Sequence, residues 1–342
     1  MMNQFPVTRF ADRILPAPVD GGFALPDDWV WCGSCIRGDE GRYHLFAARW
    51  PRSMPFFLGY QAYSEIVRAV SDTPAGPYRF AEVVLPDRGG DFWDGRMTHN
   101  PTVLRWGGQY VLFYIGSTFH GPKPSAAELR AWKEPGLPCY RGIRIGVATA
   151  DSPAGPWRRR DQPFLNIRPD NWDRTVVTNP SPCLAPDGRL LLYYRTNTPQ
   201  GCRIGLAIFR DLDRPCVWRS DAPVLEVAGL PMEDPFIWWA GDHYEMIAKD
   251  LNGRVTGAFG NGLHALSADG LHWELAPSPV AYSRTLQWND GRTETVGCFE
   301  RPQLLLQDGV PTHLFAAVAD GPGGFNAATR TWNAVVPLKG GG

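Results

Sequence analysis

The chain has 342 residues, 44% of them hydrophobic, and its 34 Lys and Arg nearly balance its 35 Asp and Glu. This length is sufficient for a large core, and the lack of a basic stripe speaks against nucleic acid as a partner. No stretch approaches the roughly 18 apolar residues of a membrane-spanning helix, so we also expect no membrane association.

The seven cysteines are scattered along the chain, at positions 32, 35, 139, 183, 202, 216 and 298. An odd number without regular spacing favours a reducing compartment over a disulfide framework. Residues 1–22 lack the continuous apolar segment of a secretory signal. We therefore expect a cytoplasmic protein, although a removed secretory leader would leave this same sequence. The oligomeric state is not indicated.

Five segments repeat one pattern: a small or polar start, a short apolar strand, a turn and a second apolar strand. In chain order they are residues 32–50, 100–117, 179–196, 233–250 and 300–318. Their turns are Glu40-Gly41, Gly107-Gly108, Asp187-Gly188, Gly241-Asp242 and Asp308-Gly309. Turn dipeptides between β-branched and aromatic runs are typical of β-hairpins.

A second pair of strands follows several of these hairpins. Residues 65–80 and 145–160 share Ala/Val-rich strands and the strings TPAGPY and SPAGPW, and looser copies occupy 203–218 and 262–275. Five units of about four antiparallel strands predict an all-β fold, a five-bladed β-propeller that forms one domain over residues 1–342. A β-sandwich would explain the alternation but not the five copies.

Two details of the ring depend on other segments. One helical stretch, PSAAELRAWKEPG at 124–136, reads as an insertion between strands. The ring closes through residues 331–338 or through the N-terminal segment, and the sequence leaves that choice open.

The inner strands of the five units begin with polar residues. The starts are Cys32-Gly33, Asn100-Pro101, Asn179-Pro180, Glu233-Asp234-Pro235 and Glu300-Arg301-Pro302. Two of them share a ten-residue frame, FWDGRMTHNP at 92–101 and NWDRTVVTNP at 171–180. In a propeller these starts meet at one end of the central channel, so we expect polar and charged side chains to converge there.

Carboxylates ringed by aromatic residues suit a carbohydrate, because aromatic rings stack on sugars and polar groups bond their hydroxyls. Glycosidic cleavage generally needs two carboxyl groups that flank the bond. The catalytic candidates are Glu233, Glu300, Asp94, Asp173 and Asp234. Each also has a structural interpretation: Asp94 and Asp173 could cap loops, Glu300 could form an ion pair, and adjacent Glu233 and Asp234 should point to opposite faces.

Further polar and aromatic residues lie at the same predicted end of the channel. The substrate-binding candidates are Trp31, Arg49, Trp93, His99, Asn100, Asn179, Arg195, Lys249 and Arg301. The two Asn residues could instead form turns, and the cations could neutralise the neighbouring acids. We interpret His99 as a hydrogen-bonding residue rather than a metal ligand.

The sequence predicts no metal-binding residues and no required cofactor; a structural cation in the channel is left open. Cys32-Gly-Ser-Cys35 resembles a CxxC motif, but no second ligand pair for zinc is present and the motif lies at a predicted strand start. We interpret both cysteines as packing residues.

The repeated hairpins, with the strings SDTPAGPY and ADSPAGPW, resemble the five-bladed propeller glycoside hydrolases of families 43, 62, 32, 68, 117 and 130. The chain is similar to an atypical branch of family 43. The resemblance implies a general acid at Glu233, in a Glu-x-Pro segment. Where that family has its base and its pKa-modulating Asp, this chain has Cys32 and Asn179, so Asp94, Asp173 or Glu300 would have to supply the missing acid.

Three functions follow as hypotheses. The first is a glycoside hydrolase that acts at a carbohydrate terminus or on a short oligosaccharide, with Glu233 as the acid. The second is a glycoside phosphorylase or transglycosylase on the same scaffold, with a phosphate site from Arg49, Arg195 or Lys249. The third is a carbohydrate-binding propeller without catalysis, which the missing acids favour.

Overall fold

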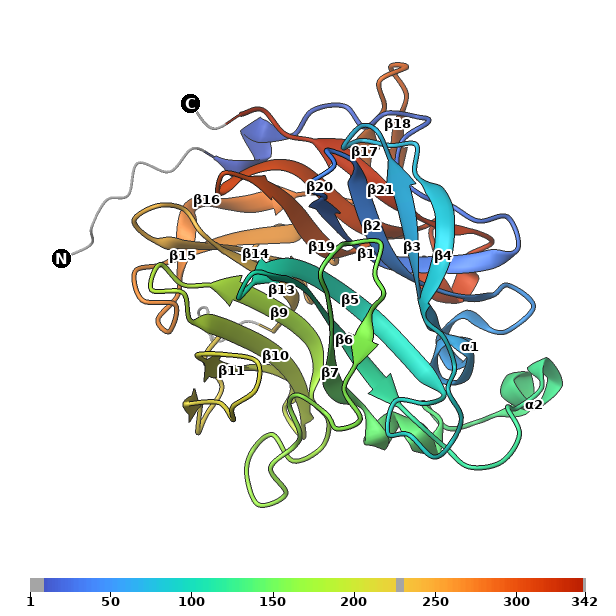
Figure 1. Cartoon of the computed structure of the whole chain (residues 1–342). Helices are drawn as coiled ribbons and strands as arrows, with labels where there is room; N and C mark the ends of the chain where they lie inside the picture. Colours follow the sequence, from blue (N-terminus) through green and yellow to red (C-terminus); the bar gives the residue numbers. More distant parts are fainter. Residues whose placement is uncertain (1–8, 226–230, 341–342) are drawn as a thin grey trace.

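The computed structural model describes residues 9–225 and 231–340, and its β-sheets form a ring around a central axis (Figure 1). Four sheets have four antiparallel strands in sequence order and a fifth has three. The predicted all-β, five-bladed propeller is therefore confirmed; the assignment of residues 1–342 to one domain stays a prediction.

Each blade runs from an inner to an outer strand. Blade one contains β1 (Asp28–Arg37), β2 (Tyr43–Pro51), β3 (Glu65–Ser71) and β4 (Arg79–Leu85). Blade two contains β5 (Met97–Trp106), β6 (Gln109–Ser117), β7 (Arg144–Ala150) and β8 (Arg158–Arg159). Blade three contains β9 (Thr178–Leu184), β10 (Leu190–Thr198), β11 (Gly201–Phe209) and β12 (Trp218–Arg219). Blade four contains β13 (Met232–Trp239), β14 (Tyr244–Asp250), β15 (Gly262–Ser267) and β16 (Glu274–Tyr282). Blade five contains β19 (Cys298–Gln307), β20 (Val310–Ala319) and β21 (Thr331–Pro337), and the hairpin β17 (Thr285–Gln287) and β18 (Thr293–Thr295) precedes it.

Turn chemistry explains the sharpest hairpins. Gly107 and Gly108 join β5 to β6 with φ angles of 60° and 81°, and Asp308 and Gly309 join β19 to β20 with φ angles of 52° and 81°. A two-residue turn with two positive φ angles matches the twist of the flanking strands, and Gly and Asp tolerate this conformation.

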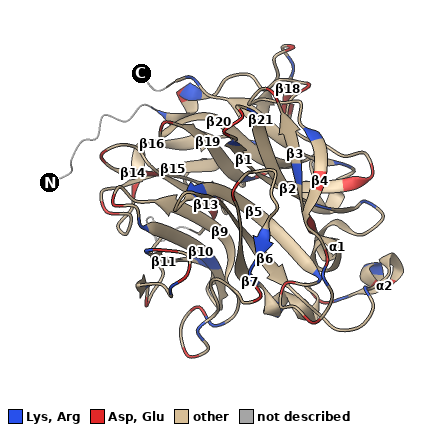
Figure 2. Ribbon diagram, viewed as in Figure 1, with Lys and Arg blue, Asp and Glu red and all other residues tan. Residues whose placement is uncertain are grey.

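The core lies between the blades. Five hydrophobic clusters of described residues each join two neighbouring blades. Because a blade packs against neighbours on both faces, its middle strands need not alternate between apolar and polar residues. Every residue of 190–194, Leu-Leu-Leu-Tyr-Tyr, is buried. The stacked apolar faces fix the position of each inner strand, and therefore of the side chains at the axis. Figure 2 colours the Lys, Arg, Asp and Glu positions along the ribbon.

Both segments that the sequence left open contribute to ring closure. Of residues 331–338, all but the last form β21 (Thr331–Pro337), and the N-terminal segment runs beside it as an outer partner. Phe23 and Asn333 exchange two backbone hydrogen bonds of 2.9 and 2.8 Å, and Ile14 bridges Leu338. The first and last described segments are thus joined within blade five.

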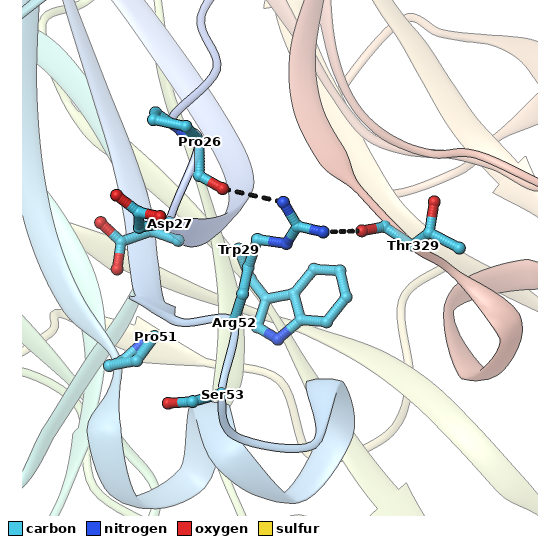
Figure 3. A pocket seen from close by; sticks show the side chains of 8 residues that line it. Pro26, Asp27, Trp29, Pro51, Arg52, Ser53 and Thr329 are labelled. Carbon is cyan, nitrogen blue, oxygen red and sulfur yellow. Dashed lines mark hydrogen bonds between the residues drawn. The ribbon is translucent and has the colours of Figure 1, made fainter.

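A cavity of about 790 Å³ lies at the junction of blades one and five (Figure 3). The Arg52 guanidinium crosses it, donating to the carbonyl oxygens of Pro26 at 2.8 Å and Thr329 at 2.5 Å, and lies over the Trp29 ring. Arg52 therefore fastens the two blades together. None of the residues that line this cavity is a predicted catalytic residue.

The helical segments are short: η1 (Phe10–Arg13), α1 (Phe56–Tyr63), α2 (Ala126–Ala131), η2 (Pro138–Gly142) and η3 (Gly324–Ala327). Helix α2 lies within the predicted stretch 124–136, and its start is fixed by a capping box of Ser125 and Glu128. Helix α1 was not predicted from the sequence. Its sequence, FFLGYQAY, has weak helix propensity and no polar face, so packing rather than local preference holds it.

Candidate active site at the inner strands

The inner strand of every blade contains the same backbone irregularity. The pairing register shifts near the start of each inner ladder. At each shift one residue has a φ angle between 50° and 55°: Cys32, Asn100, Asn179, Asp234 and Arg301. Asn and Asp tolerate this left-handed region well. A proline follows in four of the five blades and leaves no N–H unpaired at the bulge.

The side chains of these five residues, one from each blade, form a ring in which four hydrogen bonds link the members. The Cys32 thiol donates to Asn100 Oδ1 at 2.7 Å, Asn100 Nδ2 to Asn179 Oδ1 at 2.7 Å, and Asn179 Nδ2 to Asp234 Oδ1 at 2.6 Å. Arg301 Nη1 donates to the same Asp234 oxygen at 2.8 Å, and its charge acts on the Cys32 thiol at the other end of this series of hydrogen bonds. All five residues are buried, and burial raises the pKa of Cys32 to about 12.

The residue before each ring member occupies a second layer, which contains Trp31, His99, Thr178, Glu233 and Glu300. Its two acids come together. Lys249, directly opposite Glu233 on β14, donates to Glu300 Oε1 at 2.6 Å and lies 3.8 Å from Glu233 Oε2. Arg195, from β10, donates to Glu233 Oε1 at 2.5 Å. We call Glu233, Glu300, Lys249 and Arg195 the acid cluster.

The acid cluster is largely but not completely buried: the side chains of Glu233 and Glu300 are 18% and 12% exposed. Burial raises the pKa of Glu233, and so does the negative charge of Asp234, although Arg195 and Lys249 oppose this. Burial alone would lower the pKa of Lys249, but Glu300 and Glu233 outweigh it and raise that pKa. Glu233 therefore stays protonated to a higher pH than a free glutamate side chain.

Two tyrosines and a histidine extend the acid cluster. The Tyr60 ring, from α1, stacks on His99 with ring centroids 4.6 Å apart. The Tyr140 hydroxyl, from η2, accepts hydrogen bonds from Asn197 at 3.2 Å and Arg195 at 3.4 Å. Burial, with the Arg301 charge, lowers the pKa of His99 to about 3, so this imidazole is neutral at neutral pH.

The structure does not bring Asp94 and Asp173 into the acid cluster. Both are completely buried, in matching sites of blades two and three. Each carboxylate accepts a hydrogen bond of 2.6 Å from a tyrosine hydroxyl, Tyr114 or Tyr194. Each is also flanked by two arginines: Arg88 and Arg159 for Asp94, and Arg168 and Arg219 for Asp173. Both carboxylates thus have structural partners, which are tyrosine and arginine side chains rather than the loop backbone suggested by the sequence.

Three of the proposed binding residues serve packing or ion pairing elsewhere. Trp93 stacks on Tyr114, and Trp31 is 6% exposed, with its ring against Phe56. Arg49 pairs with Glu65 at 2.8 Å, away from Glu233. The other six binding candidates lie near the axis. His99 belongs to the second layer, Arg195 and Lys249 to the acid cluster, and Asn100, Asn179 and Arg301 to the ring.

Four neighbours of the acid cluster were not predicted from the sequence: Tyr60, Tyr140, Asn197 and Phe259. Tyr60 and Tyr140 come from the two connections of blades one and two that contain helical turns. Phe259 lies in the loop after Lys249, with its ring centre 5.3 Å from the Lys249 ammonium. The unusual length of these connections, compared with the tight hairpin turns, was the available signal.

Within residues 9–225 and 231–340, no group of three or more His, Cys, Asp or Glu side chains is arranged to hold a metal ion. All seven cysteines are free thiols. No described helix has the length and apolarity to cross a membrane.

Solved structures of carbohydrate-active proteins share this fold, although no protein-family model and no curated protein matches the chain. A family 117 glycoside hydrolase from the marine bacterium Zobellia galactanivorans has a TM-score of 0.68 at 16% identity, covering 95% of this chain and 89% of its own. A protein described as a complex of BT0996 with RGII has a TM-score of 0.70 at 16% identity, with coverages of 96% and 93%. CoXyl43, a family 43 β-xylosidase/α-arabinofuranosidase from a compost microbial metagenome, has a TM-score of 0.62 at 13% identity, with coverages of 95% and 95%.

The chain therefore shares the five-bladed propeller fold of these proteins, and the resemblance noted in the sequence is confirmed for the fold. At these identities the likeness shows the fold. The chemistry of this chain depends on the residues of the acid cluster.

Proposed function

We propose that this protein is a glycoside hydrolase in which Glu233 protonates the leaving oxygen and Glu300 is the second carboxylate. The observation that carries the proposal is the pairing of both acids with one ammonium group, Lys249, where each side chain keeps partial contact with solvent. Two carboxyl groups on either side of a bond are the usual requirement for glycosidic cleavage.

The surroundings of the two acids differ in the way that this chemistry needs. The raised pKa of Glu233 suits a group that must hold a proton at working pH and then release it to the substrate. Glu300 accepts a hydrogen bond from the Lys249 ammonium at 2.6 Å, which suits a carboxylate that acts in its charged form. Glu300 would activate a water molecule or attack the anomeric carbon, and the anomeric configuration of the product distinguishes the two.

Carbohydrate is the substrate class that fits the rest of the site. Asn197, Tyr140 and Tyr60 place an amide and two hydroxyl groups near the acids, as recognition of sugar hydroxyls requires. The neighbours named above include a β-xylosidase/α-arabinofuranosidase and a complex with RGII. We therefore propose a short oligosaccharide or the terminus of a longer one as the substrate.

The test is a hydrolysis screen with xylo-oligosaccharides, arabino-oligosaccharides and RGII fragments, read by released reducing sugar. We expect release without added phosphate. Release of a sugar 1-phosphate only when phosphate is present would identify a phosphorylase instead, and no turnover of any glycoside in a wider panel of furanosides, pyranosides and uronides would contradict the proposal.

A binding function without catalysis is the second candidate, because Cys32 and Asn179 stand where family 43 enzymes have two acids. Both residues are committed to the buried ring, so neither position can supply a carboxylate. Binding of an oligosaccharide without its cleavage would favour this candidate.

The alkaline limit of activity should shift when Arg195 is replaced by Met. The Arg195 charge lowers the pKa of Glu233, so its removal raises that pKa further. A general acid must be protonated, and the alkaline limb of kcat/KM should therefore move to higher pH. Arg49→Met is the control, since Arg49 pairs with Glu65 instead. A limb that stays in place or moves to lower pH would mean that Glu233 is not the acid.

A further inference from the structure

The loop between β14 and β15 presents an aromatic ring beside the acid cluster. Phe259 is 54% exposed, more than any of the other large hydrophobic side chains found exposed in the described part of the chain. Its ring centre lies 5.3 Å from the Lys249 ammonium, and Lys249 contacts both Glu233 and Glu300. An exposed phenylalanine next to paired acids has no role in the core.

The loop that carries Phe259 is organised from within by one buried carboxylate. Asp250, which is completely buried, accepts hydrogen bonds at Oδ1 from the backbone N–H groups of Asn252 and Gly253. At Oδ2 it accepts from the N–H groups of Val255 and Thr256 and from the Thr256 hydroxyl, all at 3.0 Å. Five hydrogen bonds to one side chain give the loop a defined shape, so Phe259 has a fixed place.

We propose that Phe259 is a stacking platform for the sugar ring bound at Glu233 and Glu300, an inference that rests on the proposed function. The ring of Phe259 offers an apolar face to the C–H face of a sugar, while the neighbouring charged groups bond its hydroxyls. The two aromatic residues predicted from the sequence to bind substrate, Trp31 and Trp93, pack against Phe56 and Tyr114. Phe259, in contrast, is 54% exposed and lies beside Lys249.

The ammonium of Lys249 over the ring has a consequence for binding. A cation near an aromatic face is attracted to it, and that attraction strengthens where water is excluded. A sugar on Phe259 would cover the acid cluster and exclude water from Lys249, Glu233 and Glu300. Stacking and desolvation of the acids would therefore occur together.

The experiment compares Phe259→Ala with Phe259→Tyr and Phe259→Trp, using the oligosaccharide that the wild type cleaves. Loss of one buried aromatic contact corresponds to roughly a 10- to 100-fold rise in KM. We expect that rise in the Ala variant, with a smaller effect on kcat, and recovery in the Tyr and Trp variants. The matched control is Phe80→Ala, because Phe80 is 43% exposed and lies 5.0 Å from Arg49, outside the acid cluster.

A binding measurement separates this inference from the proposed function. Calorimetric titration of xylotriose, arabinotriose and RGII fragments into the wild type and the Phe259→Ala variant needs no turnover. Weaker binding to the variant supports the platform even where nothing is cleaved, in which case only the hydrolase proposal fails. Unchanged KM and unchanged binding in Phe259→Ala overturn the platform and leave the hydrolase proposal standing. If no sugar binds to the wild type, both are wrong.

Discussion

Replacing Glu233 by Gln is expected to lower kcat on an unactivated glycoside by about 10²- to 10⁴-fold. Gln keeps the size of the side chain and a hydrogen bond to Arg195, but it has no proton to give to the leaving oxygen. The loss should be smaller on a substrate whose leaving group needs no protonation, such as a dinitrophenyl glycoside. Steady-state kinetics on the two substrates measure this difference.

Glu65→Gln is the matched control for this variant. Glu65 also pairs with an arginine, Arg49, at 2.8 Å, and its side chain is 26% exposed. It lies on β3, outside the acid cluster, so kcat should stay close to that of the wild type. Equal activity of the Glu233→Gln variant and the wild type on the unactivated glycoside would remove Glu233 from the mechanism.

Replacing Asp173 by Asn should cost about 3–5 kcal/mol in the free energy of unfolding, because it breaks a buried ion-pair network from one side. The carboxylate has no exposed surface and lies between Arg168 at 3.0 Å and Arg219 at 2.5 Å. Asparagine would leave the Arg219 guanidinium without its counter-charge, and Arg168 with only the exposed Asp221 at 3.3 Å. Urea denaturation measures the loss.

Asp213→Asn provides the comparison at the surface. Asp213 pairs with Arg160, but its side chain is 92% exposed, so its removal should change the unfolding free energy by at most about 1 kcal/mol. The kcat of correctly folded Asp173→Asn protein should match the wild type. A fall in kcat with unchanged stability would make Asp173 a catalytic candidate again.

The fold could be predicted from the sequence because its signals are local. Turn dipeptides such as Gly107-Gly108 fix the hairpins within a few residues, and the five copies of the hairpin specify the ring. The acid pair could be predicted for the same reason: Glu233 and Glu300 hold equivalent places in two copies, and a ring brings equivalent places together.

The partners of those acids could not be predicted, since they depend on contacts between distant segments. Asp94 lies just before an inner strand, as a catalytic acid would. The sequence does not show that Asp94 is buried and paired with Arg159 from another strand. Tyr60 reaches the cluster on a helix with weak local signals. Phe259 lies in a loop whose shape depends on Asp250, and no periodic pattern marks that loop.

The ring of side chains from Cys32 to Arg301 has a consequence for how the protein unfolds. Linear repeat arrays can fray from their ends, because an end unit contacts one neighbour only. Here four side-chain hydrogen bonds at the axis join residues of all five blades, an apolar cluster joins blade five to blade one, and the N-terminal segment fastens the last sheet at the rim. Opening any single blade breaks links on both of its sides, so the propeller should melt cooperatively rather than blade by blade.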